Sequence, residues 1–343
     1  MKTISICREF YENYIAAIIN EKFAEYETRI AVGVVGEGSE CFGYDDEFSR
    51  DHDFGYGVCL WLTDEDYNVI APELSASYYG VLRDFESDLA DKGVKDTIKT
   101  IDMDTGRTRY DQRRGVMKIS DFYQNLLGIN FDMDVPSLTE AQWFYIEEWK
   151  LAVATNGEVF RDDLGKFSGI RKMLLGHYPK RIWRMRLVNA MHGYAAAAQA
   201  NYPRCMARGD EVTAAICRNQ GLERAMEIVF LLSRRFAPYY KWTFRAMGEL
   251  PYDKKIPNSN CKNWIIQISE LLERIATAGS QSSAWQRYCY SSDSINNADE
   301  LVRLFDKVAA LIVAELNKQG LTDSVDPFLE IHSQALARTI SNL

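Results

Sequence analysis

The N-terminal segment carries apolar residues on one side of a helical pattern. An apolar tract runs from Tyr14 to Ile19, and charged residues precede it at Arg8, Glu9 and Glu12. This pattern predicts an amphipathic helix, because a signal peptide has a different charge order and is followed by a small-residue cleavage site. The residues predicted to face the core are Tyr11, Ile15, Ile18 and Ile19.

Short runs rich in β-branched and aromatic residues follow, separated by polar and glycine-rich segments. Such runs are typical of buried strands. The clearest is Arg29–Gly36 (RIAVGVVG), which ends in glycine before a polar stretch that continues to Arg50. The predicted strands are 29–36, 51–63, 97–104, 115–120 and 158–162, with a turn at Asp104-Thr105-Gly106 and a helix over 73–92.

From about residue 139 the hydrophobic period becomes helical. Helices are predicted over 143–154, 184–200 and 211–236, and a capping box at Asn297-x-x-Glu300 predicts the beginning of another. Val212 and Ile216 are assigned to the buried face of the third, and His192 is interpreted as a core histidine of the second. The fold class is therefore α+β: residues 1–165 form a mixed sheet domain, and residues 166–343 form an all-helical domain that packs closely against it.

Composition limits the classes of function. The 343 residues are 47% hydrophobic and 26% charged, which is enough apolar material for a real core. The 40 basic and 49 acidic residues give a net charge of −9, so non-specific binding to nucleic acid is disfavoured. A local basic site for one small polyphosphate remains compatible with that charge.

Cysteine usage and hydropathy indicate the compartment. The 7 cysteines are scattered and never spaced C-x-x-C, which fits neither a disulfide framework nor a zinc site. No apolar run reaches the roughly 18 residues that a membrane-spanning helix needs. We therefore expect a soluble cytoplasmic protein with no membrane partner.

One arrangement of glycine, serine and aspartate residues indicates a metal and phosphate site. Gly38-Ser39 follows the predicted strand over 29–36, and after eleven further residues comes Asp51-His52-Asp53. On a strand, Asp51 and Asp53 would project from the same face, and two such close negative charges require a positive partner. Mg²⁺ is suitable because it takes carboxylate oxygens and keeps positions open for phosphate oxygens. A Gly-Ser turn lets backbone N–H groups and a hydroxyl approach a phosphate closely.

This pattern resembles the signature of the nucleotidyltransferase superfamily, which has the polymerase-β-like fold. The resemblance covers roughly the first 165 residues and rests on the strand, Gly38-Ser39, the spacer and Asp51-x-Asp53. It implies transfer of a nucleoside monophosphate from a nucleoside triphosphate, with Mg²⁺ or Mn²⁺ as cofactor and pyrophosphate as leaving group. The alternative interpretation is that Asp51 and Asp53 are exposed acids at the end of a strand, since D-x-D is common.

The longer run from Gly36 to Asp53 is similar to an uncharacterised bacterial branch of that superfamily, described as a domain of unknown function followed by a helical region. Two later segments resemble antibiotic nucleotidyltransferases: 156–162 (NGEVFRD) and 237–242 (APYYKW). The resemblance implies that Lys241 helps to hold the triphosphate. Tyr240 could stack on a base, and Arg234, Arg235 and Arg245 would add positive charge; the alternative is that Tyr240 is a core aromatic residue and the arginines are solvated.

The remaining catalytic groups are less well specified. Asp102 is assigned as the third carboxylate and metal ligand, with Asp104 and Asp121 as rivals. Candidates for the general base that activates the acceptor hydroxyl are Glu147, Glu148 and Asp162.

These observations predict an enzyme with its active cleft between the two domains. Its substrates would be a nucleoside triphosphate, ATP being the expected one, and a small hydroxylated acceptor. The alternatives are a nucleotidyltransferase that modifies proteins, like certain toxins, and a catalytically inactive module that binds nucleotide. Neither the acceptor nor the oligomeric state follows from the sequence.

Overall fold

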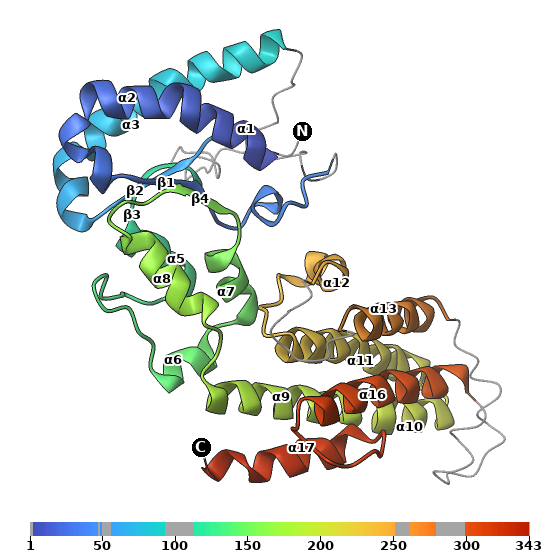
Figure 1. Cartoon of the computed structure of the whole chain (residues 1–343). Helices are drawn as coiled ribbons and strands as arrows, with labels where there is room; N and C mark the ends of the chain where they lie inside the picture. Colours follow the sequence, from blue (N-terminus) through green and yellow to red (C-terminus); the bar gives the residue numbers. More distant parts are fainter. Residues whose placement is uncertain are drawn as a thin grey trace. The chain divides into compact units, whose positions relative to one another are not determined.

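The structure is a computed structural model that describes residues 3–46, 49, 56–92, 113–250, 261–278 and 299–342. The chain forms two compact units, Met1–Gly176 and His177–Leu343, which are described separately below. The first unit combines helices with a sheet and the second is helical, in agreement with the predicted α+β class (Figure 1).

The sheet of the first unit has four described strands: β1 (Ala31–Val34), β2 (Cys59–Leu62), β3 (Gly115–Lys118) and β4 (Glu158–Arg161). Their order is β3-β2-β1-β4. β1 runs antiparallel to both β2 and β4, whereas β2 and β3 are parallel. Each strand lies within a predicted one, but the predicted strand over 51–63 was too long, because Tyr56–Val58 is not in the ladder. The predicted strand over 97–104 lies outside the described residues.

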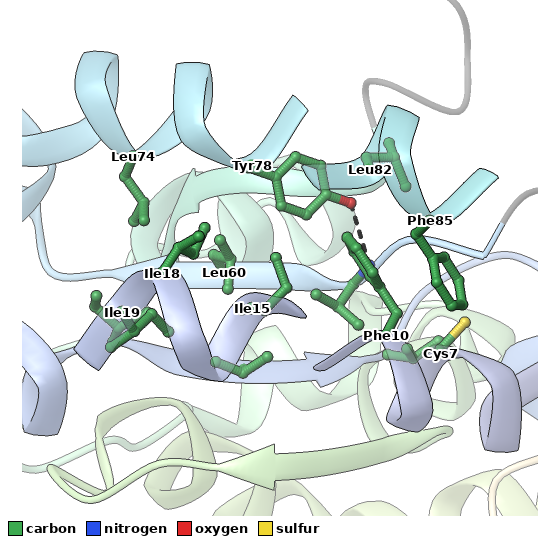
Figure 2. Close-up of a cluster of buried hydrophobic side chains, with 14 of the residues drawn as sticks. Cys7, Phe10, Ile15, Ile18, Ile19, Leu60, Leu74, Tyr78, Leu82 and Phe85 are labelled. Carbon is green, nitrogen blue, oxygen red and sulfur yellow. Dashed lines mark hydrogen bonds between the residues drawn. The ribbon is translucent and has the colours of Figure 1, made fainter. Parts of the chain in front are cut away.

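One face of the sheet is covered by the N-terminal helical segment and by the long helix α3. This segment comprises α1 (Thr3–Phe10), a π-helical turn (Tyr11–Ile15) and α2 (Ala16–Lys22), and α3 spans Asp64–Asp91. Alternation along the strands turns Val32, Val34, Leu60 and Leu62 towards these helices, where they join one apolar cluster. Figure 2 shows this cluster, in which Val58 N–H donates to the Tyr78 hydroxyl at 3.2 Å.

The opposite face of the sheet packs on α5 (Ile119–Leu127) and α8 (Lys166–Leu175) (Figure 1). Trp61 projects to this face, where its ring stacks on Phe167 with centroids 3.9 Å apart and meets Phe122 edge-on. Gly33 on the neighbouring strand leaves room for that indole, because a Cβ there would lie 3.1 Å from it. The first unit thus has helices on both faces of a small mixed sheet.

The second unit is built from helices. α9 contacts α11 and α17, and α16 contacts α11 and α13. Tyr194 on α9 donates its hydroxyl to the Phe305 carbonyl on α16 at 2.8 Å, which ties the two helices together in the core. The helices are α9 (Lys180–Tyr194), a π-helical segment (Ala195–Asn201), α10 (Tyr202–Ala207), α11 (Glu211–Leu232), α12 (Tyr240–Gly248), α13 (Cys261–Thr277), α16 (Glu300–Lys318) and α17 (Leu329–Arg338).

Several predicted helices differ from the observed ones. The helix predicted over 143–154 is two helices, α6 (Glu140–Tyr145) and α7 (Glu148–Thr155), because Ile146 and Glu147 are extended. The helix predicted from residue 73 begins at Asp64, where the Thr63 hydroxyl caps it. α16 is capped by Asp299, whose carboxylate accepts the Leu301 N–H at 2.6 Å; Asn297 lies outside the described residues.

Three predictions about buried faces were wrong. His192 is exposed and pairs with Glu330 at 2.7 Å, because it lies off the stripe formed by Met191 and Tyr194. Val212 and Ile216 are exposed, since α11 buries the side that carries Ala214, Cys217 and Gly221. The buried histidine of this unit is His332, which is bonded to the Thr322 hydroxyl and the Asp326 carbonyl.

Candidate functional site

The chain leaves β1 in a turn that a distant side chain holds in place. Gly36 has φ 142°, a conformation that L-residues with a side chain rarely adopt. Its N–H donates to Asn156 Oδ1 at 3.1 Å, and its carbonyl accepts from Asn156 Nδ2 at 2.7 Å. The carboxamide of Asn156 therefore fixes the backbone of this turn from the loop that precedes β4.

Gly38 and Ser39, both predicted to bind nucleotide, form the end of this turn. Gly38 is the residue before a single 3₁₀ turn, Ser39–Phe42, and a Cβ at Gly38 would overlap the carboxylate of Glu40. Ser39 is 8% exposed, and its carbonyl accepts the Tyr44 N–H at 2.9 Å. The turn is tightly packed, and only glycine fits at Gly38 without moving the acid.

A buried ion pair lies directly behind the turn. Arg114 Nη2 is 2.6 Å from Glu40 Oε1, and the two side chains are only 2% and 10% exposed. The other terminal nitrogen of Arg114 donates to the Arg113 carbonyl at 2.9 Å. Buried charges of this kind are tolerated only when they are paired and hydrogen-bonded. The pair joins the turn after β1 to the segment that enters β3.

Buried thiols surround this ion pair. Arg114 Nη2 lies 3.3 Å from Cys41 Sγ, and Cys59 Sγ donates to the Arg113 carbonyl at 3.2 Å. Burial raises the pKa of Cys41 to about 12, although the charge of Arg114 opposes this shift. Burial also raises the pKa of Cys59. Both thiols are therefore neutral, and Glu40 is the counter-charge of Arg114.

The loop before β4 closes on the same turn. Gly157 N–H donates to the Cys41 carbonyl at 2.7 Å, and Gly157 has φ 62°. A Cβ at this position would overlap the carbonyl oxygen of Val34. Arg171 from α8 donates to the Asn156 carbonyl at 2.5 Å. The Asn156-Gly157 pair singled out in the sequence thus serves to bring the loop against the end of β1.

A cavity of about 680 Å³ opens beside the turn within the first unit. Its charged residues include Glu37 and Arg113, whose side chains are 3.4 Å apart, and Asp121 near the beginning of α5. The lining residues are Val35, Gly36, Glu37, Tyr67, Arg113, Arg114, Val116, Met117, Asp121, Phe122, Asn125, Leu126 and Val153. The cavity is large enough for a small-molecule ligand and mixes apolar walls with charged and amide groups.

Asp51, Asp53 and Asp102 lie outside the described residues, as does the rival Asp104. Within the described ranges, no group of three acidic, histidine or cysteine side chains could hold a metal ion. Two acids next to the turn have partners within the protein: Glu40 pairs with Arg114, and Asp45 accepts from Thr3 N–H at 2.9 Å.

Lys241 and Tyr240 lie at the beginning of α12 in the second unit. Tyr240 is 89% exposed, so it is not a core aromatic residue. Lys241 Nζ lies 5.4 Å from the centroid of the half-buried Trp242 ring, and Trp242 Nε1 donates to the Tyr239 hydroxyl at 2.9 Å. The lysine and the tyrosine are accessible, and the neighbouring aromatic rings support the lysine side chain.

The candidate general bases have structural partners. Glu147 is exposed and pairs with Lys150 at 3.3 Å. Asp162 Oδ2 accepts the Ser168 N–H at 2.7 Å, which satisfies a donor in the first turn of α8. Glu148 lies at the beginning of α7, with one carboxylate oxygen fully buried. None of the three lines the 680 Å³ cavity.

Sequence reasoning missed Arg114, Glu40 and the clamping role of Asn156. Glu40 and Arg114 are 74 residues apart, so no local pattern relates them. The available signal was a charged pair, Arg113-Arg114, directly before a short apolar strand, where a buried cation implies a buried partner.

Comparison with known proteins gives one match. Residues 143–243 match the family model described as a domain of unknown function (DUF4037). The matched segment runs from α6 to the beginning of α12 and contains β4 and the Asn156-Gly157 loop. No curated protein and no solved structure matches the chain. No helix among the described residues is long and apolar enough to cross a membrane.

Proposed function

We propose that this protein is a metal-dependent nucleotidyltransferase that moves a nucleoside monophosphate, AMP as the first choice, from a nucleoside triphosphate to a small hydroxylated acceptor. The proposal includes the nucleotidyltransferase-like fold for the first unit. The observation that carries it is the placement of the Gly38-Ser39 turn. That turn follows β1, and β1 is paired with β2, the strand that the Asp51-x-Asp53 segment precedes.

The register of the sheet brings the relevant chain segments to one edge. Gly33 near the end of β1 pairs with Cys59 at the beginning of β2, and Cys59 pairs with Gly115 at the beginning of β3. Asp53 precedes the described residue Tyr56 by three residues, a stretch that spans at most about 11 Å. The turn after β1, the segment that enters β2 and the arginines that precede β3 therefore lie at the same edge of the sheet.

In this proposal the residues have separate tasks. Asp51 and Asp53 would hold Mg²⁺, with Asp102 as the third ligand that we expect. The bound metal would supply charge neutralisation at the phosphates and orient the entering and leaving oxygens. The Gly38-Ser39 backbone approaches the phosphate chain, and the Arg114–Glu40 pair keeps the turn rigid. Lys241 contributes positive charge and Tyr240 a surface for stacking a base.

The cavity of the first unit is our candidate for the acceptor. Its mixture of apolar side chains with Glu37, Asp121 and Asn125 suits a small polar molecule better than a nucleic-acid primer, in line with the net charge of −9. Asp121 is the rival third carboxylate that lines this cavity.

Binding calorimetry with Mg-ATP tests the site assignment. We expect the wild-type chain to bind, and we expect Asp53→Asn to lose binding because the neutral amide is a poor ligand for Mg²⁺. Glu73→Gln is the matched control, since it also converts a carboxylate to an amide but lies exposed on α3. Equal affinities for all three proteins would contradict the assignment.

Labelled ATP then identifies the acceptor class. Incubation with ATP labelled at the α-phosphate should give a labelled small molecule when the correct acceptor is present. A labelled protein band would instead favour a protein-modifying enzyme. Tight binding with no labelled product in a broad acceptor panel would favour a module that binds nucleotide without turnover.

A further inference from the structure

The second unit concentrates backbone strain at one place. Among the described residues, His177 (φ 67°) and Arg234 (φ 54°) are the only residues other than glycine with positive φ. Such conformations cost free energy and tend to occur at functional sites. His177 lies just before α9, and Arg234 lies just after α11. Their side chains belong to one group of aromatic rings and arginines.

Stacking on an indole ring orients the guanidinium of Arg234. Its guanidinium lies 3.1 Å above the centroid of the Trp183 ring, and Trp183 is buried with its Nε1 bonded to the Leu231 carbonyl at 2.8 Å. Partial desolvation, together with the charge of Arg184, lowers the pKa of Arg234 to about 10. Arg184 is itself oriented by a 2.7 Å hydrogen bond to the Thr339 hydroxyl.

Within the described residues, no acid pairs with these arginines. In the part of the chain that the structure describes, neither Arg184, Arg234 nor Arg235 forms an ion pair. By contrast, Arg224 on the adjacent helix α11 pairs with Glu227 at 2.5 Å. Arg234 and Arg235 are both exposed, so a ligand from solvent can reach them.

The half-buried imidazole of His177 lies in the positive potential of neighbouring arginines. Its ring stacks on Phe236 with centroids 4.8 Å apart, and neither ring nitrogen makes a well-formed hydrogen bond within the described residues. Burial, together with the charges of Arg234, Arg235 and Arg186, lowers the pKa of His177 to about 3. The charges of these three arginines therefore act on the same imidazole.

The beginning of α9 adds to this field. Its sequence opens Lys180-Arg181-Ile182-Trp183-Arg184, and its first turn contains no acid. A helix N-terminus carries partial positive charge, so acids stabilise it and bases do not. Positive side chains beside a positive helix end repel one another, so a bound anion would stabilise this region.

We propose that Arg184, Arg234 and Arg235 form a binding site for a phosphate-bearing anion on the second unit. Guanidinium groups whose planes are fixed by stacking and by hydrogen bonds match the paired oxygens of phosphate. Several adjacent positive charges fit a multiply charged anion such as a polyphosphate better than a single carboxylate. The site does not depend on Asp51, Asp53 or a metal ion, so it stands independently of the proposed reaction.

Titration calorimetry of the full chain in buffer containing EDTA tests this site, with pyrophosphate as the probe. We expect saturable binding to the wild type, and about tenfold weaker binding to Arg234→Gln through loss of a charge-assisted contact. Arg224→Gln is the matched control, because it removes one arginine of α11 that already has a partner. It should bind pyrophosphate as the wild type does.

Further titrations identify the ligand and distinguish this anion site from the proposed Mg-ATP site. Orthophosphate and metal-free ATP titrated in the same way distinguish a single phosphate, a polyphosphate and a nucleotide. Asp53→Asn should bind pyrophosphate normally in EDTA even where it loses Mg-ATP. Arg234→Gln should melt at the same temperature as the wild type or higher, because repulsion from Arg184 is removed.

Two outcomes would overturn the inference. One is the absence of any pyrophosphate binding by the wild-type chain. The other is equal weakening by Arg234→Gln and Arg224→Gln, which would mean that only net charge matters.

Discussion

The two units each hold an arginine in a special environment, and the two environments are opposites. Arg114 in the first unit is buried and paired with Glu40 at 2.6 Å. Arg234 in the second unit is exposed, stacked on Trp183 and without an ion-pair partner among the described residues. The first arrangement satisfies its charge internally and fixes a turn. The second keeps its charge available, which is what a ligand site requires.

The same contrast extends to the backbone. In the first unit the left-handed residues next to the turn are glycines, such as Gly157 at φ 62°, so the close packing there carries little strain. In the second unit the left-handed positions are occupied by His177 and Arg234. The turn in the first unit is therefore rigid and internally paired, whereas the second unit keeps an accessible cation next to left-handed residues other than glycine.

The largest expected effect comes from breaking the buried pair. Arg114→Met leaves the Glu40 carboxylate buried without a partner and should lower the free energy of unfolding by about 3–5 kcal/mol. Urea unfolding measures this loss. The double variant Arg114→Met/Glu40→Leu removes both charges and should recover part of the stability. A loss below about 1 kcal/mol for the single variant would mean that the pair does not hold the turn.

The second largest loss of stability is expected from a substitution in the tightly packed loop before β4. Gly157→Ala places a Cβ against the Val34 carbonyl and should destabilise the chain by about 2–4 kcal/mol, combining overlap with backbone strain. Gly165→Ala is the matched control, because Gly165 also has positive φ, 68°, but nothing lies within 4 Å of its would-be Cβ. Its cost should be about 1 kcal/mol. Equal losses in the two variants would show that overlap at Gly157 is unimportant.

A smaller, pH-dependent effect follows from His177. Burial and the nearby arginines lower its pKa to about 3 from an ordinary value of 6.5. Between these values the unfolded chain binds the proton and the folded chain does not, so stability falls as the pH drops below 6.5. The contribution at pH 5 is a loss of up to about 2 kcal/mol relative to pH 7.5.

Urea unfolding at pH 7.5 and pH 5.0 measures this contribution. His177→Asn should lose less stability than the wild type between the two pH values, since asparagine does not titrate and tolerates positive φ. His192→Asn, which changes the exposed histidine that pairs with Glu330, should keep the wild-type pH dependence of the His177 contribution. An unchanged pH dependence in His177→Asn would contradict the account of this residue.

Local sequence patterns were sufficient for much of the fold. The β-branched runs located β1, β3 and β4, and apolar periodicity identified the buried face of the N-terminal segment. The beginning of α3 was missed: the helix predicted over 73–92 begins at Asp64, where Thr63 and Asp66 form the cap. The break between α6 and α7 at Ile146 and Glu147 was missed because no glycine or proline marks it in the sequence.

The candidate site was predictable only in part. The turn at Gly38 and Ser39 could be predicted because a glycine follows directly after a buried strand. The metal-binding role of Asp51 and Asp53 stays a prediction, since both lie outside the described residues. The Arg114–Glu40 pair and the Asn156 contact with Gly36 join segments 74 and 120 residues apart, and such contacts depend on the tertiary fold. The imbalance of charge around Arg234 was equally hidden, since the sequence shows where arginines are but not which of them have acidic partners.

Pyrophosphate release from the four nucleoside triphosphates, with Mg²⁺ or Mn²⁺ and an acceptor panel, tests the central claim most directly. The account predicts metal-dependent release by the wild type and a rate lower by about a hundredfold or more in Asp53→Asn, because the transition-state charge would lose its compensation. Release at the same rate in Asp53→Asn would contradict it, as would the absence of release by the wild type under every condition.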